Sequence, residues 1–462
     1  MERTTAKKNK YEIDMCNGTI MDKLISFSLP LMLSGILQLM FNAVDIIVVG
    51  RFSGSQALAA VGSTSALINV FTNLFIGISL GANVLTARFY AAGREKEVSE
   101  TVHTAITLAL VSGIVMALVG LVFSKGALAL MGTPDDVIRL SALYMRIYFL
   151  GMPFFMLYNY GAAILRAVGD TKRPLLFLMI AGVINACLNM VLVIVFKLGV
   201  AGVAIATVIS QMISCVLVLR CLCRSESSYR LRFSELGMKG YYLKQIFSVG
   251  VPAGIQSTVI NFSNVLLQSS VNSFGSTAMA GYTAANNLLG FLYVSVNSIT
   301  QACMSFTSQN YGVGKLKRMD RVLADCMILS VVVAVVLGCI CYGFGPEILQ
   351  IYTEDAEVIA CGMEILAYTT ITYFLCGWMD LFPGALRGMG YSAVPMVLSV
   401  IGTVGTRVVW IFGIFPYHRS LAILFISYPA SWIITIVLQV ICFYFVRRRV
   451  HRRSQTLSGQ EA

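Results

Sequence analysis

Charged side chains are scarce in this sequence. They make up 12% of its 462 residues, whereas a soluble domain carries roughly a quarter. Apolar residues reach 57%, and the mean hydropathy is +0.78. This composition excludes an ordinary soluble domain and favours a protein that lies within a lipid bilayer.

Histidine is nearly absent, and the twelve cysteines form no metal-binding pattern. The three histidines, His103, His418 and His451, lie at the ends of apolar segments or in a tail. Cys221-x-Cys223 is the one tight cysteine pair, and no histidine accompanies it. Because a membrane-embedded enzyme needs clustered acid, base or metal-binding residues, we expect neither an enzyme nor a bound cofactor.

Apolar stretches of about 20 residues recur along the chain, and each is long enough to cross about 30 Å of hydrocarbon as a helix. We therefore predict an all-α polytopic membrane protein with twelve transmembrane helices. The predicted spans are approximately 26–50, 57–82, 102–123, 141–164, 174–196, 199–222, 246–271, 279–304, 322–344, 360–384, 394–415 and 421–446.

The second half of the chain repeats the first half at a constant offset of 221 residues. Without any gap, Gly169 aligns with Gly390 and Pro174 aligns with Pro395. Six spans per repeat give both repeats the same orientation, so we expect two parallel six-helix repeats. Because substrate sites of such proteins lie at the interface of the repeats, the duplication indicates a transporter.

These boundaries divide the chain into five parts. They are a cytoplasmic amino tail (1–25), an amino-terminal lobe (26–223), a cytoplasmic linker (224–244), a carboxyl-terminal lobe (245–446) and a basic cytoplasmic tail (447–462).

The net charge of +12 is unevenly distributed over the predicted loops. Basic residues concentrate in the two tails, the linker and the loops on the same side of the membrane. The opposite side carries only Arg51, Lys125, Arg139, Lys197 and Arg419. This asymmetry predicts that both termini are cytoplasmic and argues against a nucleic-acid partner. We expect the protein in the cell (inner) membrane.

Asp45 is the most informative polar residue, because it lies within the first predicted span. A carboxylate at membrane depth costs about 3 kcal/mol and is a functional candidate by default. Gln38, Asn42 and Asp45 follow i, i+4, i+7 spacing and share one helix face. We interpret Asp45 as a site for a coupling cation, Na⁺ or H⁺; the alternative is a structural hydrogen bond between helices.

Further amides interrupt other apolar helices and predict a polar substrate cleft. Amides also hold membrane helices together, so each one alone has a packing alternative. Together with Gln38 and Asn42, the cleft candidates are Asn69, Asn73, Asn261, Asn264, Gln268 and Asn297.

Three motifs resemble the multidrug and toxic compound extrusion (MATE) family. They are Val44-Asp45 with Val49-Gly50-Arg51, Leu165-Arg-Ala-Val-Gly-Asp-Thr171, and Leu386-Arg-Gly-Met-Gly390. The resemblance covers the chain from Pro30 to about Arg447. It implies two lobes that form a V, and export of organic cations or amphipathic drugs in exchange for Na⁺ or H⁺ by alternating access.

The resemblance also implies a coupling-cation site. The family's pattern falls on Asp45, Asn185, Asn189 and Thr207. Asn189 departs from it, since relatives carry a second carboxylate there. Oxygen ligands still suit Na⁺ at Asp45. Because the site has one negative charge fewer, protonation of Asp45 alone is the alternative interpretation.

Charged residues in the second repeat raise a further hypothesis. Asp380 and Arg387 lie two helical turns apart, and Arg407 lies on the next predicted span. We consider a charge pair that closes the cytoplasmic side, or a static structural pair.

Two other transporter classes are alternatives. A flippase for a lipid-linked precursor belongs to the same superfamily, but it calls for a more cationic cleft than Arg146 and Arg407 provide. A major facilitator carrier usually has a Gly-x-x-x-Asp-Arg loop, which residues 88–100 lack. The expected partners are the bilayer and small cationic or amphipathic molecules, and we expect a monomer.

Overall fold

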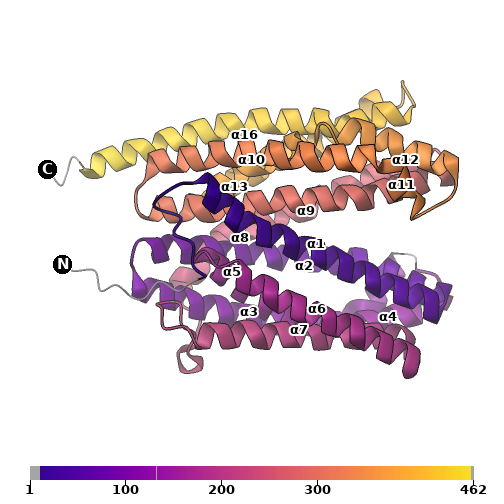
Figure 1. The fold of residues 1–462 in the computed structure, drawn as a ribbon, viewed down its shortest axis with the longest axis horizontal. Helices are drawn as coiled ribbons and strands as arrows, with labels where there is room; N and C mark the ends of the chain where they lie inside the picture. The colour runs from indigo at the N-terminus through magenta and orange to yellow at the C-terminus, as the bar shows by residue number, and fades with distance from the viewer. Residues whose placement is uncertain (1–10, 132, 459–462) are drawn as a thin grey trace. The chain divides into compact units, whose positions relative to one another are not determined.

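The computed structural model describes residues 11–131 and 133–458, and within that range it contains helices and no strands (Figure 1). Residues 1–10 of the predicted amino tail and residues 459–462 of the predicted basic tail lie outside the described residues. The all-α expectation is confirmed.

The helices of the first half follow one another through short turns. They are α1 Met21–Ser53, α2 Ser55–Ala91, α3 Glu95–Leu130, α4 Asp135–Leu150, α5 Met152–Ala167, α6 Lys172–Met190, the π-helix η1 Val191–Val195 and α7 Gly199–Cys223.

The second half repeats this order after a short 3₁₀ turn, η2 Phe233–Glu235. Its helices are α8 Gly240–Asn272, α9 Ser276–Gly312, α10 Leu316–Gly343, α11 Gly345–Gln350, α12 Ala356–Thr369, α13 Tyr373–Gly388, α14 Ala393–Ser399, the π-helix η3 Val400–Gly405, α15 Thr406–Val409, the π-helix η4 Trp410–Ile414 and α16 Leu421–Ser458.

Each of the twelve predicted spans coincides with a helix or with consecutive helical segments. Among the described residues, eight helices are long and apolar enough to cross a membrane by length and composition. Two further spans are bent pairs, α4 with α5 at 47° and α12 with α13 at 51°. The more polar α8 and α9 contain 33 and 37 residues, which at 1.5 Å per residue also suffices to cross.

Equivalent turns between helices have the same backbone conformation in the two repeats. Gly54 and its counterpart Gly275 have φ angles of 88° and 101°, and Gly169 and its counterpart Gly390 have 97° and 91°. Side chains with a Cβ rarely adopt these angles, so glycine is required at the same turn of both repeats. The packing order repeats as well: α5 contacts α2, α3 and α7, and α13 contacts α9, α10 and α16.

The chain forms two compact units. Unit 1 comprises Leu33–Gly254 with the described part of Met1–Asp14, and unit 2 comprises Met15–Met32 with the described part of Ile255–Ala462. The boundaries fall inside α1 and α8. The first part of α1 therefore belongs to unit 2, and the first part of α8 belongs to unit 1.

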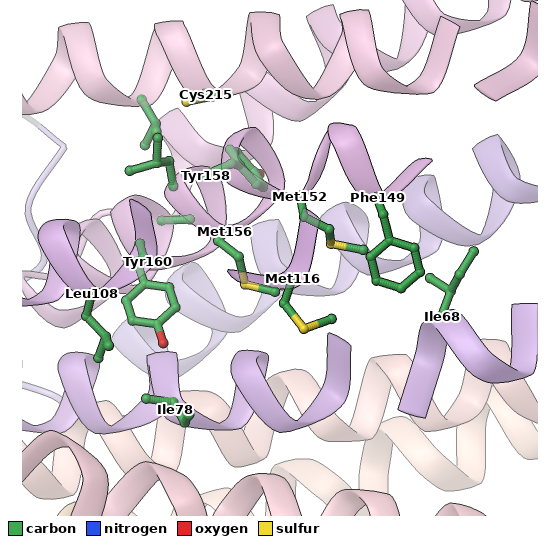
Figure 2. Close-up of a cluster of buried hydrophobic side chains, with 14 of the residues drawn as sticks. Ile68, Ile78, Leu108, Met116, Phe149, Met152, Met156, Tyr158, Tyr160 and Cys215 are labelled. Carbon is green, nitrogen blue, oxygen red and sulfur yellow. The ribbon is translucent and has the colours of Figure 1, made fainter. Parts of the chain in front are cut away.

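A large cluster of apolar side chains forms the core of unit 1, and Figure 2 shows part of it. Met116 on α3, Phe149 on α4 and Met156 on α5 are nearly or fully buried. The Phe149 ring meets the Phe71 ring of α2 edge-on, with centroids 6.1 Å apart. This core fixes α4, α5 and α7 relative to one another, and α7 in turn packs against α6.

The polar segment 224–244 packs on unit 1 rather than extending freely. The Arg232 backbone N–H donates to His103 Nε2 at 3.0 Å. The fully buried Tyr229 donates its hydroxyl to Glu12 Oε1 at 2.7 Å. The Lys239 side chain forms an ion pair with Glu100 on α3. These contacts explain why the segment belongs to unit 1.

Glycines allow α2 and the first part of α8 to approach closely. A Cβ on Gly77 would lie 2.3 Å from the backbone of Gly254, and one on Gly81 would lie 2.2 Å from the carbonyl oxygen of Ile246. Such backbone contact is typical of small residues at membrane helix crossings.

We predict that Gly77→Ala lowers the thermal stability of the purified protein, because the two backbones must separate. Overpacking of this kind costs about 1–3 kcal/mol. Gly62→Ala is the matched control on the same helix, since nothing lies within 4 Å of its added Cβ. It removes backbone freedom and should stabilise by about 0.5–1 kcal/mol. Thermal unfolding in detergent checks both, and equal midpoints for the two variants would contradict the close crossing.

Candidate functional site

The Asp45 carboxylate lies among α1, α6 and α7 within unit 1. Asp45 is 9% exposed, and the side chains of Asn185 and Asn189 on α6 are buried beside it. Asn189 Nδ2 donates a hydrogen bond to Asp45 Oδ1 and another, of 3.2 Å, to Asn185 Oδ1. The four-residue spacing of the two asparagines places both on the same face of α6.

Thr207 on α7 completes the group. Its hydroxyl has one proton and lies 3.0 Å from Val203 O and 3.4 Å from Asp45 Oδ2. Asn185 Nδ2 donates to the same hydroxyl at 3.5 Å. The four side chains that the resemblance implies therefore form one connected hydrogen-bond network.

Neutral groups alone satisfy the Asp45 carboxylate. Within the described part of the chain, no cationic side chain lies within 4 Å of it. Asn189 Oδ1 is buried and accepts no hydrogen bond. The network thus offers a carboxylate, an amide oxygen without a donor and a hydroxyl, which are the oxygen ligands that suit a hard cation. A proton on Asp45 would neutralise the same charge.

Two tyrosines lie on α4, which packs against the α7 helix that carries Thr207, and the sequence analysis did not single them out. Tyr144 and Tyr148 stack with ring centroids 6.1 Å apart. Their i, i+4 spacing puts them on one face of α4, and this spacing was a usable signal.

The predicted cleft residues of unit 1 are more accessible than Asp45. Gln38, Asn42 and Asn69 are exposed, and Asn73 is half-buried. Their side chains form no hydrogen bond with any residue that the structure describes. They are available to a ligand, although the network around Asp45 does not include them.

The predicted cleft residues of unit 2 are partly engaged. Asn261 is exposed, whereas Asn264, Gln268 and Asn297 are half-buried. Asn264 Oδ1 accepts a 2.7 Å hydrogen bond from Arg407, and Asn297 Oδ1 accepts one of 3.1 Å from Gln301.

The charged residues of α13 do not form a close ion pair. Over residues 11–131 and 133–458, no cationic nitrogen lies within 4 Å of the Asp380 carboxylate. Arg387 Nη2 instead donates to Gln256 Oε1 at 2.6 Å. Arg407 contacts Ser263 and Asn264. The hypothesis of a charge pair that closes the cytoplasmic side stays a prediction.

Comparisons with known proteins agree on one family. The MatE family model matches residues 30–191 and again residues 252–412, at the spacing of the internal repeat. The chain is 32% identical over 434 residues to "Probable multidrug resistance protein YoeA" of Bacillus subtilis (strain 168), covering 92% of this chain and 93% of that protein. It is 22% identical to "Multidrug export protein MepA" of Staphylococcus aureus (strain NCTC 8325 / PS 47), with 82% and 84% covered.

Solved structures share the fold. One titled "Outward-facing conformation of a multidrug resistance MATE family transporter of the MOP superfamily" superposes with a TM-score of 0.87 at 19% identity, covering 97% of this chain and all of that one. Duplicated bundles of long apolar helices and these matches define a multi-pass membrane transport protein rather than an enzyme. The chain belongs to the MATE family.

We predict that Asn189→Asp makes stability depend on pH and Na⁺. The new carboxylate cannot donate to Asp45, so two like charges would face each other. Because the repulsion needs both groups ionised, the melting temperature should fall as pH rises in Na⁺-free buffer. Acid or Na⁺ should restore it.

Asn69→Asp is the control for this prediction, since it adds an acid to an exposed position of the same unit. Thermal unfolding of both variants with and without Na⁺ checks the expectation. Identical pH profiles for the two variants would contradict the network.

Proposed function

We propose that this protein is a secondary active antiporter that exports organic cations or amphipathic drugs in exchange for Na⁺ or H⁺. The observation that carries the proposal is the buried Asp45 carboxylate, whose neighbours are neutral donors. Multidrug names of the relatives support drug-like substrates, and they do not favour the flippase alternative.

The coupling step follows from the electrostatics of unit 1. An ionised Asp45 is costly at membrane depth, so it recruits a cation or a proton. The bound ion removes the negative charge and gives Asn189 Oδ1 or Thr207 Oγ1 a new partner. Since α6 and α7 carry these partners, occupancy biases their packing. This bias couples ion binding to the access state of the substrate site.

The membrane potential supplies enough energy for useful export of an electrically neutral or zwitterionic substrate, because its exchange for one Na⁺ or H⁺ moves one net charge. Exchange for a singly charged organic cation moves no net charge and depends on the concentration gradient of the ion. One elementary charge that moves down 100 mV releases about 2.3 kcal/mol. Since about 1.4 kcal/mol corresponds to a factor of ten, this supports a nearly fiftyfold concentration ratio.

The cellular setting rests on the charge distribution. Basic residues cluster in the tails and in the segment 224–244, so we infer that both termini are cytoplasmic and that the protein lies in the cell (inner) membrane. Each unit has its own apolar core, and we propose that the monomer is the working form.

We predict that Asp45→Asn abolishes gradient-driven efflux from cells or liposomes while the protein still inserts. The amide keeps the shape of the carboxylate but binds neither a proton nor a cation with useful affinity. Asp320→Asn is the control, because Asp320 forms an exposed pair with Arg447 at 2.7 Å. Such a pair contributes at most about 1 kcal/mol. Efflux that persists in Asp45→Asn would refute the assignment.

Imposing Na⁺ and pH gradients separately on proteoliposomes identifies the ion. We expect one of them to drive counterflow of an ethidium-like cation in the wild-type protein and neither to drive it in Asp45→Asn. A wild-type protein that responds to neither gradient would exclude this mode of coupling.

A further inference from the structure

Arg407 is a buried guanidinium that the coupling site does not use. It lies on α15, between the π-helical segments η3 and η4, and is 3% exposed. π-Helical turns inside α-helices occur frequently at functional sites. An arginine at membrane depth is expensive and is a functional candidate by default.

Neutral groups of unit 2 orient the guanidinium. Arg407 Nη1 donates to Asn264 Oδ1 at 2.7 Å and to Ser263 Oγ at 3.3 Å. The ring of Tyr428 on α16 lies under the guanidinium plane, 4.7 Å from Cζ to the ring centroid. The two contacts on α8 and the stacking on α16 together fix the orientation of the guanidinium, and with it the direction of the edge formed by Nε and Nη2.

That remaining edge, formed by Nε and Nη2, has no acceptor. Arg407 Nε is fully buried and forms no hydrogen bond. No group in the described part of the chain accepts from Nη2, and no carboxylate there lies within 4 Å of the guanidinium. The Nε–Nη2 edge is one that binds a carboxylate through two parallel hydrogen bonds.

The internal repeat allows the buried charges of the two units to be compared position by position. At the offset of 221 residues, Asp45 aligns with Leu266, and Thr207 aligns with Tyr428. Arg407 aligns with Ala186, next to Asn185. Neither charge has a charged counterpart in the other repeat, so unit 1 carries a buried negative charge on α1 and unit 2 carries a buried positive charge on α15.

We propose that Arg407 binds the carboxylate of a transported organic molecule, so that unit 2 recognises the anionic group of an amphipathic or zwitterionic substrate. The carboxylate accepts from Nε and Nη2 while Asn264, Ser263 and Tyr428 keep the fork in place. This inference deepens the proposed export function and rests on it for its physiological meaning. Binding at equilibrium needs no ion gradient, so its test stands apart from the coupling mechanism.

A matched pair of dyes tests the proposal. Rhodamine 110 carries a free benzoate, and rhodamine 123 is its methyl ester, so the two differ chiefly in the carboxylate. Fluorescence anisotropy on the purified full chain gives both dissociation constants. We expect the wild-type protein to bind rhodamine 110 about tenfold or more tightly than the ester, as charge-assisted hydrogen bonds imply.

Variants of Arg407 test whether this residue causes the tighter binding of rhodamine 110. Arg407→Gln should abolish the preference for the free carboxylate with little change for the ester, whereas Arg407→Lys should keep part of it, because lysine retains the charge but not the fork. Arg419→Gln is the matched control: Arg419 is an exposed arginine of the same unit, and it contacts Ser273 Oγ at 3.3 Å. It should leave the preference unchanged.

Three outcomes would overturn the proposal. The first is equal affinity of the wild-type protein for the two dyes, which needs no variant and therefore decides even if Arg407→Gln fails to fold. The second is a preference that survives in folded Arg407→Gln. The third is displacement of rhodamine 110 by chloride as readily as by benzoate, which would assign the site to an inorganic anion.

Discussion

A carboxylate without a cationic neighbour is the constraint on which unit 1 depends. Asp45 would cost about 3 kcal/mol if it faced hydrocarbon. Two neutral hydrogen-bond donors, Asn189 and Thr207, stabilise the carboxylate in place of an arginine or a lysine. A permanent counter-ion would remove the need for a mobile one. Under the proposed function, the neutral shell leaves the charge of Asp45 to be balanced by an ion that binds and dissociates.

The two repeats kept their backbone and diverged in charge. Turn glycines such as Gly169 and Gly390 have nearly the same φ angle, because no other residue fits that turn at low cost. The charged side chains within the helices differ between the repeats, although each unit has its own apolar core. Asp45 has no acidic counterpart in unit 2, and Arg407 has no basic counterpart in unit 1. The two units therefore carry buried charges of opposite sign on different helices of the repeat.

Most of the spans were predictable because a membrane helix is predominantly apolar. Hydropathy does not show the bends, because residues 141–164 and 360–384 each read as one continuous apolar stretch. Pro153, at the start of α5, is a local signal for the first bend. The docking of residues 224–244 on α3 was also beyond the sequence, because a polar, basic segment looks the same whether it is solvated or packed. In the site, the four-residue spacing of Asn185 and Asn189 predicts that they share a face of α6. The hydrogen bond between Asn189 and Asp45 joins segments 144 residues apart, and spacing does not predict it.

The sequence by itself determined the membrane setting, the duplication, the all-α class and, through its motifs, the MATE family. These properties follow from composition and from local periodicity, which act over single helices. Only the tertiary structure decided which donors reach Asp45, which edge of Arg407 lacks an acceptor, and where α1 and α8 divide between the units. Such features depend on close packing between segments far apart in the chain, and hydropathy does not encode the direction in which a buried polar side chain points.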